Sequence, residues 1–112
     1  MMHWLLGLWK GPTGMKEISV AELSQQPQTV RRIDVRDADE FEGELGHLEG
    51  AELVPLPQLR QLASDWPRDV PLLVICRSGN RSGQACGVLS AMGFSDVTNL
   101  RGGMLAVRQA KN

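Results

Sequence analysis

A cysteine at the end of an apolar segment is the residue of this chain best placed to do chemistry. Residues 72–76 read Leu-Leu-Val-Ile-Cys, and Arg-Ser-Gly-Asn-Arg-Ser follows them. A strand of leucine and β-branched residues is stiff and buried, so it delivers Cys76 to the carboxyl edge of a sheet, where open α/β folds bind their ligands. The sequence therefore predicts that Cys76 is a catalytic nucleophile at that edge.

The residues after Cys76 are of the types that build an anion site. Gly79 and Asn80 tolerate positive φ angles, which let backbone N–H groups curl around the sulfur. Ser82 is expected to cap the N-terminus of the next helix, whose dipole also favours negative charge. We therefore expect this loop, with Ser78 as a further member, to bind an anion.

Two arginines supply positive charge to the same loop. Arg77 and Arg81 lie within residues 70–95, a stretch that contains no Asp or Glu. With the backbone N–H groups and the helix dipole, they should hold the pKa of the Cys76 thiol below about 8.5, the value of a free cysteine. A buried cysteine without chemistry is the alternative, and the acid-free basic loop argues against it.

Length and composition limit the classes of protein to which the chain can belong. Its 112 residues suffice for one domain with a single core. A formal net charge of −1 gives no indication of general nucleic-acid or membrane-surface binding. The 2 cysteines accompany no His/Cys cluster, so neither a disulfide framework nor a metal site is predicted. A thiolate catalyst must stay reduced, which favours a cytoplasmic location.

The first 14 residues differ in character from the rest. This segment contains two tryptophans and three leucines before Lys-Gly-Pro-Thr-Gly, is too short to span a bilayer, and lacks the features of a secretory signal. We expect residues 1–14 to be an N-terminal extension that is flexible or non-native, with a weak membrane-interface anchor as the alternative. Residues 15–112 are expected to form the domain.

Short strands and short helices alternate from Lys16 onward. This alternation predicts a small α/β domain with a mostly parallel five-stranded sheet and helices on both faces. The strands are expected at residues 17–18, 31–35, 52–54, 72–75 and 96–99. The helices are expected at residues 20–26, 37–42, 56–63, 82–92 and 102–109, with Ser19 capping the first. Residues 43–50 are expected to form a loop.

Several motifs, in their order along the chain, resemble those of single-domain rhodaneses, a family of sulfurtransferases. The matching motifs are Ile33-Asp34-Val35-Arg36, Glu40-Phe41, Gly46-His47-Leu48-Glu49-Gly50-Ala51, Val54-Pro55-Leu56, Cys76-Arg77-Ser78-Gly79-Asn80-Arg81-Ser82 and Leu100-Arg101-Gly102-Gly103-Met104. The resemblance spans about residues 16–108. One departure is Val107, at a place where the family often has tryptophan, and the smaller side chain is expected to leave the last helix less filled.

The resemblance implies a rhodanese-like fold and sulfur transfer in two steps. The Cys76 thiolate takes sulfane sulfur from thiosulfate or a persulfide donor, and cyanide or a thiol then removes it from the Cys76 persulfide. The expected donor-binding residues are Arg77, Ser78, Gly79, Asn80, Arg81, Ser82 and Arg36. No metal or organic cofactor is needed, a protein acceptor is compatible with the scheme, and neither nucleic acid nor stable membrane insertion is implied.

Two other functions are weighed against sulfur transfer. Phosphatases and arsenate reductases related to rhodaneses have one more residue in the loop, whereas four residues separate Cys76 from Arg81 here. The smaller ring should fit one sulfur atom over the thiolate and crowd a phosphoryl group. The other alternative is a non-turnover persulfide carrier, or a redox or sulfide sensor, that acts on a protein partner.

Residues of the first motifs have a structural and a chemical interpretation. Arg36 follows a strand end, where it could help to hold the donor or pair in solvent with Asp37 or Asp39. Asp34 is interpreted as a structural acceptor for loop amides or arginines rather than an acid catalyst. His47 is interpreted as a hydrogen-bonding loop residue rather than a general base.

The second cysteine, Cys86, has the same two interpretations. It is expected to face the core with Leu89, as small cysteines in helices commonly do. The alternative is a resolving thiol that attacks the persulfide of Cys76.

Overall fold

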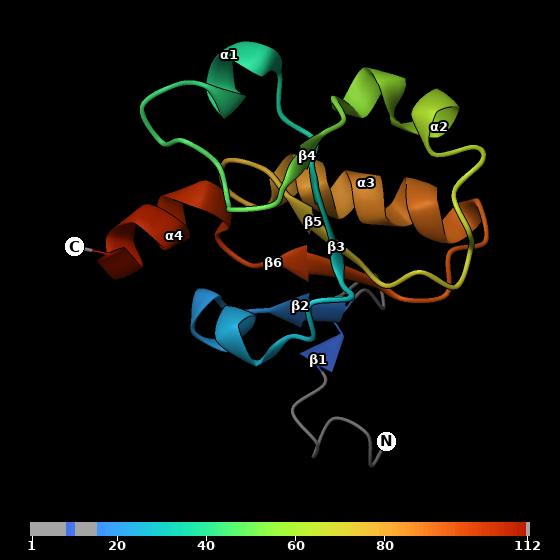
Figure 1. Ribbon diagram of the computed structural model, residues 1–112, viewed down its shortest axis with the longest axis horizontal. Helices are drawn as coiled ribbons and strands as arrows, with labels where there is room; N and C mark the ends of the chain where they lie inside the picture. The colour runs from blue at the N-terminus through green and yellow to red at the C-terminus, as the bar shows by residue number, and fades with distance from the viewer. Residues whose placement is uncertain (1–8, 11–15, 112) are drawn as a thin grey trace.

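A computed structural model describes residues 9–10 and 16–111, whose strands form one six-stranded sheet (Figure 1). The strand order is β1-β2-β6-β5-β3-β4. The strands are β1 (Trp9–Lys10), β2 (Lys16–Ile18), β3 (Arg31–Asp34), β4 (Glu52–Leu53), β5 (Leu72–Ile75) and β6 (Val97–Leu100). β1 pairs antiparallel with β2, and the pairs among β2 to β6 are parallel. These five parallel strands confirm the predicted α/β fold.

Helices cover both faces of the sheet (Figure 1). α2 (Leu59–Leu62) and α3 (Asn80–Ala91) pack on one face, and the 3₁₀ helix η2 (Val20–Gln25) and α4 (Gly103–Lys111) pack on the other. α1 (Ala38–Phe41) follows β3 at the carboxyl edge, and the 3₁₀ helix η3 (Leu56–Gln58) leads into α2. Each face of the sheet therefore has its own apolar core.

Alternation along β5 divides its side chains between the two cores. Leu72 and Val74 belong to the core under α2 and α3, whereas Leu73 and Ile75 belong to the core under η2 and α4. All four are at most 1% exposed, as expected for a central parallel strand that is covered on both faces. The same alternation turns Cys76 toward α3.

The structure gives the type and start of three of the predicted helices. Ser19 is the N-cap of the first as predicted, and this helix is of the 3₁₀ type. Residues 56–63 are divided between η3 and α2. α3 begins at Asn80 rather than Ser82, because Gly79 adopts a φ of 108° and lets the chain enter the helix directly after the loop.

The predicted N-terminal extension, residues 1–14, lies outside the described residues except for β1 at the edge of the sheet. Within residues 16–111, Val107 of α4 is 4% exposed and packs in the core under η2 and α4, so the position that departs from the family is buried. No helix in the described part of the chain has the length and apolar character needed to cross a bilayer.

Candidate active site

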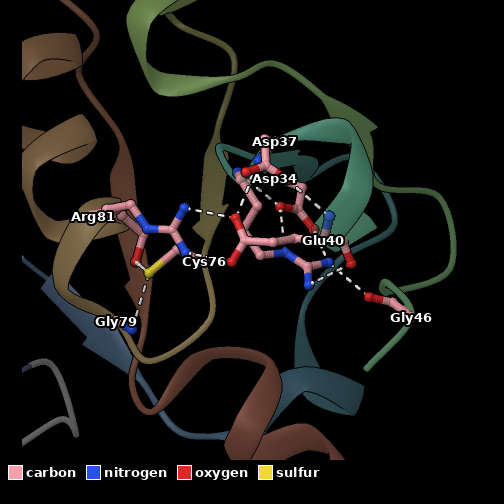
Figure 2. A network of polar contacts seen from close by, with 9 residues as sticks. Asp34, Asp37, Glu40, Gly46, Cys76, Gly79 and Arg81 are labelled. Carbon is pink, nitrogen blue, oxygen red and sulfur yellow. Dashed lines mark hydrogen bonds and ion pairs between the residues drawn. The ribbon is translucent and has the colours of Figure 1, made fainter. Parts of the chain in front are cut away.

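The sulfur of Cys76 lies at the carboxyl end of β5, as predicted. Cys76 is 1% exposed, and two donors point at its Sγ: the backbone N–H of Gly79 at 3.0 Å and the hydroxyl of Ser82 at 3.2 Å. Figure 2 shows this contact with Gly79 and the side chain of Arg81 beside it. The donors around Sγ favour the anionic form of the sulfur.

These donors outweigh the effect of burial on the thiol. Burial raises the pKa of Cys76, whereas hydrogen bonds from the Ser82 hydroxyl and from the backbone of Ser82, Gly79 and Ser78 lower it, and the resulting pKa lies below its ordinary value. The direction of this pKa shift confirms the expectation from the sequence, but its causes are hydrogen bonds rather than the charges of Arg77 and Arg81. A lower pKa increases the fraction of thiolate, which is the nucleophilic form of cysteine.

Ser82 does not cap α3, which corrects its predicted role. Gly79 is the N-cap, so Ser82 lies in the first turn of the helix and is fully buried. Its hydroxyl points at the sulfur instead of at a backbone N–H of the helix start. The shift in helix start thus changes Ser82 from a cap into a hydrogen-bond donor to Cys76.

The first turn of α4 donates hydrogen bonds to the backbone of the Cys76 loop. The N–H of Met104 donates to the carbonyl of Cys76 at 2.9 Å, and the N–H of Leu105 donates to the carbonyl of Arg77 at 3.0 Å. Gly103 permits this approach, since an added Cβ would lie 2.4 Å from the Cys76 carbonyl oxygen. A glycine at the start of α4 is therefore required for the close packing of this helix against the Cys76 loop. The sequence analysis did not predict this contact.

Arg81 is held by Glu40, a residue that the sequence analysis did not place in the site. Its Nη1 and Nη2 donate to the two carboxylate oxygens of Glu40, each at 2.7 Å (Figure 2). The hydrogen bond from Arg81 lowers the pKa of Glu40 to about 2, and the same bond raises the pKa of Arg81. The Arg81 side chain is therefore oriented from α1.

A local signal in the sequence could have located the Glu40 carboxylate. Asp37 is the N-cap of α1, its side chain accepts the N–H of Glu40 at 2.9 Å, and the Glu40 carboxylate accepts the N–H of Asp37 in return. An Asp followed three residues later by Glu has the spacing of such a reciprocal cap. This signal places the carboxylate at the start of α1, but it does not identify Arg81 as its partner.

Arg36 is buried rather than solvated, and its partner is Asp34. It is 1% exposed, and its Nε and Nη2 donate to the two carboxylate oxygens of Asp34 at 2.9 and 2.8 Å. Its remaining hydrogen bonds go to the carbonyls of Glu40 and Gly46. The structural role of Asp34 is confirmed, and of the two interpretations of Arg36, the pairing in solvent with Asp37 or Asp39 is wrong. Arg36 ties the end of β3 to α1 and to the following loop.

The other loop residues predicted to bind the donor, Arg77, Ser78 and Asn80, are exposed. Arg77 lines a cavity of about 320 Å³ beside the loop, and the rest of its lining comes from residues 36–45. Arg77 and Cys76 are therefore adjacent in the chain, but the Arg77 side chain is exposed to solvent whereas the Cys76 sulfur is buried.

Histidine and the second cysteine have structural contacts. His47 Nδ1 hydrogen bonds with the carbonyl of Phe41 at 2.8 Å, and the two rings stack with centroids 3.7 Å apart. Cys86 lies with Leu89 in the core under α3, where burial raises the pKa of Cys86 to about 12. Both structural interpretations are confirmed. In the part of the chain that the structure describes, no group of three or more His, Cys, Asp and Glu side chains could hold a metal ion.

Comparison with known proteins identifies the family. The family model described as rhodanese-like domain matches residues 19–110. The chain is 33% identical over 100 residues to the thiosulfate sulfurtransferase of Shewanella oneidensis, covering 88% of this chain and 97% of that protein.

Solved structures agree with this match. A rhodanese-related protein from Thermoplasma volcanium superimposes with a TM-score of 0.74 at 27% identity, covering 84% of this chain and 91% of that one. The NAD-dependent persulfide reductase from A. fulgidus gives a TM-score of 0.63 at 30% identity, covering 94% of this chain and 17% of that one. From its motifs, its fold and these matches, the chain belongs to the rhodanese-like family of sulfurtransferases.

Proposed function

We propose that Cys76 carries sulfane sulfur between a small donor and an acceptor. The thiolate attacks the outer sulfur of thiosulfate or of a persulfide, the S–S bond of the donor breaks, and sulfite or a thiolate leaves with the bonding electron pair. A persulfide remains on Cys76. Cyanide or a thiol then attacks the outer sulfur of this persulfide, and Cys76 leaves as the thiolate, which restores the starting state.

The observation that carries the proposal is the pair of donors at Cys76 Sγ. A thiolate stabilised by the Gly79 N–H and the Ser82 hydroxyl needs no separate general base. The lowered pKa also makes Cys76 a better leaving group when the acceptor removes the sulfur. Because Cys76 is 1% exposed, a reactant with a narrow terminal sulfur atom fits this site better than a bulky phosphoryl group.

The charges of the loop suggest how a donor is held. The charge of Arg81 is offset by its ion pair with Glu40. Arg77 is exposed and forms no ion pair with the residues that the structure describes, so it supplies the attractive field for an anion such as thiosulfate. The loop N–H groups and the residues up to Ser82 complete the proposed donor site. A cytoplasmic location belongs to this proposal, since Cys76 must remain reduced.

A persulfide carrier that hands sulfur to a protein thiol is the second candidate. The match to the persulfide reductase favours this candidate, because the name of that protein states a persulfide substrate. The matched part is 17% of the reductase chain. The chemistry at Cys76 would be the same, and only the acceptor would differ.

Intact-mass measurement tests both candidates. After incubation with thiosulfate or a small persulfide, the protein is expected to gain the mass of one sulfur atom, and cyanide should remove it as thiocyanate. Cys76→Ser should do neither, because a serine hydroxyl stays protonated near neutral pH and cannot store sulfane sulfur. Cys86→Ser is the matched control and should retain both steps.

The outcomes separate the possibilities. A persulfide that resists cyanide and small thiols but transfers to a protein thiol would favour the carrier. A Cys86→Ser variant that forms the persulfide but cannot discharge it would make Cys86 a resolving residue. No gain in mass with either donor would contradict the proposed function.

A further inference from the structure

A buried chain of hydrogen bonds leads from Cys76 away from the loop toward β2. Ser82, which donates to the sulfur, also donates to Oδ1 of Asn99 on β6. Nδ2 of Asn99 donates to Oε2 of Glu17 at 3.0 Å and to the carbonyl of Gly79 at 3.2 Å. Ser82 is 0% and Asn99 is 2% exposed. Two buried polar side chains therefore connect the sulfur to a carboxylate of β2.

Ser82 has one hydroxyl proton for two acceptors. A serine hydroxyl donates a single hydrogen bond, so it serves either Sγ of Cys76 or Oδ1 of Asn99 at one time. A charged thiolate attracts this proton more strongly than an amide oxygen does, and a neutral sulfur attracts it less strongly. The hydrogen bond from Ser82 to Asn99 is therefore favoured when Cys76 is a thiol, and also when Sγ is bonded to a second sulfur.

Asn99 cannot relieve this competition by turning its amide. Its Nδ2 has two protons, which bond to Glu17 and to the Gly79 carbonyl. A turned amide would place Oδ1 against a carboxylate and a carbonyl without any donor between them, which is costly in a buried site. Glu17 is itself held by Arg101, whose Nε lies 3.6 Å from Oε1 of Glu17. In the folded protein Oδ1 therefore faces Ser82 as a fixed acceptor.

We propose that Asn99 is a positioning residue that sets how strongly Ser82 stabilises the Cys76 thiolate. Ser82 donates to Asn99 while Sγ carries no charge and turns to Sγ when the thiolate forms. Formation of the thiolate thus costs the Ser82–Asn99 hydrogen bond, and that bond returns when the persulfide forms, because the charge then resides on the outer sulfur. The persulfide part of this inference rests on the proposed function, whereas its test concerns the thiol alone.

Titratable and charged groups lie on the elements packed around Cys76. They are Cys86 of α3, Arg81 of α3 paired with Glu40 of α1, Glu17 of β2 paired with Arg101 after β6, Asp34 of β3 paired with Arg36, and Arg77 in the loop itself. Neutral substitutions at Asn99 and Ser82 leave all of these charges in place. A change in Cys76 ionisation in such variants therefore reports on the hydrogen bonds.

The pH dependence of Cys76 alkylation tests the proposal. The protein is treated with iodoacetamide over a pH series, and modification is followed on the Cys76 peptide by mass spectrometry. Asn99→Ala is expected to lower the midpoint pH of alkylation by roughly half a unit, because the Asn99 oxygen no longer competes for the Ser82 hydroxyl proton. At a fixed pH below the midpoint, this shift corresponds to about threefold more thiolate. Asn99→Leu preserves the volume of the side chain and is expected to act alike, with circular dichroism confirming the fold of each variant.

Ser82→Ala is the matched control for this experiment. It is expected to raise the midpoint, and in its background the Asn99 substitutions should have no effect, since the shared proton is absent. The inference is overturned if Asn99 variants raise the midpoint or leave it unchanged, or if they shift it equally with and without Ser82. Because alkylation requires no sulfur transfer, these results are independent of whether the proposed function holds.

Discussion

At the scale of single residues, burial and hydrogen bonding have opposite effects on the pKa of Cys76. Burial alone would raise the pKa of Cys76, and the hydrogen bonds from Ser82 and Gly79 reverse that effect. The two loop arginines also differ, since Arg81 uses both terminal nitrogens on a carboxylate while Arg77 is exposed. We therefore expect Arg81 to act through its position and Arg77 to act through its electrostatic field.

Lysine substitutions should separate the two arginines. Lysine keeps the charge but loses the planar fork, so Arg81→Lys is expected to lower kcat with thiosulfate by about tenfold or more, the scale of one hydrogen bond to a charged group. Arg77→Lys should chiefly raise KM, with a salt dependence, because exposed charges are screened over about 8–10 Å at physiological ionic strength. Initial rates of thiocyanate formation at several salt concentrations measure both effects. Equal, mild increases in KM would mean that the backbone alone holds the loop.

Several elements meet at the carboxyl edge of the sheet to form the site. β5 ends at Cys76, α3 provides Ser82 and Arg81, α1 provides Glu40, and the first turn of α4 closes on the loop carbonyls. The Glu40–Arg81 pair joins α1 to α3 at this point, so loss of the pair in acid is expected to change the geometry of the site.

The Glu40–Arg81 pair predicts a specific acid sensitivity. The pKa of Glu40 is about 2 in the folded protein, below its ordinary value of 4.5, so the unfolded chain takes up this proton first as the pH falls. Stability from the pair is therefore fully present above about pH 4.5 and is lost as the pH falls toward 2. In urea unfolding at a series of acidic pH values, the difference between the natural sequence and Glu40→Gln should shrink over this window. A difference that stays constant with pH would contradict the pairing as its cause.

The entry of α4 should not accept a side chain at Gly103. Its φ is 58°, and a Cβ would lie 2.6 Å from the Arg77 carbonyl oxygen as well as against Cys76. Gly103→Ala is expected to cost about 1–3 kcal/mol of unfolding free energy and to slow persulfide formation, because the loop must move. Urea unfolding and the gain of sulfur mass measure the two effects.

Gly87→Ala in α3 is the matched control for Gly103→Ala. Apart from its chain neighbours and the backbone of its own helix, no described atom lies within 4 Å of a Cβ built at Gly87. Alanine in the helix interior is expected to stabilise the protein by about 0.5–1 kcal/mol. If both variants were equally stable and equally active, α4 would not constrain the Cys76 loop.

At the scale of the whole molecule, the strand order places the site at the centre of the sheet. β5 lies between β6 and β3, so the loop after β5 has α4 and Asn99 on one side and α1 on the other. β1 pairs at the far edge, beyond β2. The site described above uses residues from Glu17 to Leu105, which suggests that the N-terminal segment is dispensable for chemistry.

Deletion of residues 1–14 tests the proposed domain boundary. The truncated protein is expected to retain sulfur transfer, and its melting temperature should fall by less than about 4 °C, which corresponds to less than about 1 kcal/mol for a domain of this size. Differential scanning calorimetry and the mass assay measure the two quantities. A larger loss of stability would mean that the contacts of this segment, such as the β1–β2 pairing, contribute to the stability of the domain, and that the segment belongs to it.

Local patterns in the sequence were sufficient for the fold class and for the centre of the site. The apolar run before Cys76, the glycine and serine after it, and the alternation of strands and helices are signals carried by residues close in sequence, and the parallel sheet and the sulfur at its edge followed from them. The element ends were less accurate, as the start of α3 shows, since this helix begins after a glycine with a positive φ and has no side-chain cap.

Only the tertiary structure decided which polar groups pair with one another. Glu40 and Arg81, Ser82 and Asn99, and Asn99 and Glu17 are brought together by strand order and helix placement, and no pattern within one segment specifies these partners. A buried charge or hydroxyl needs a hydrogen-bond partner, because leaving it unpaired would destabilise the fold. Which neighbour becomes that partner depends on which strand ends lie next to one another. The sequence by itself therefore determined the sulfur and its loop, and the packing of distant elements determined the environment that tunes it.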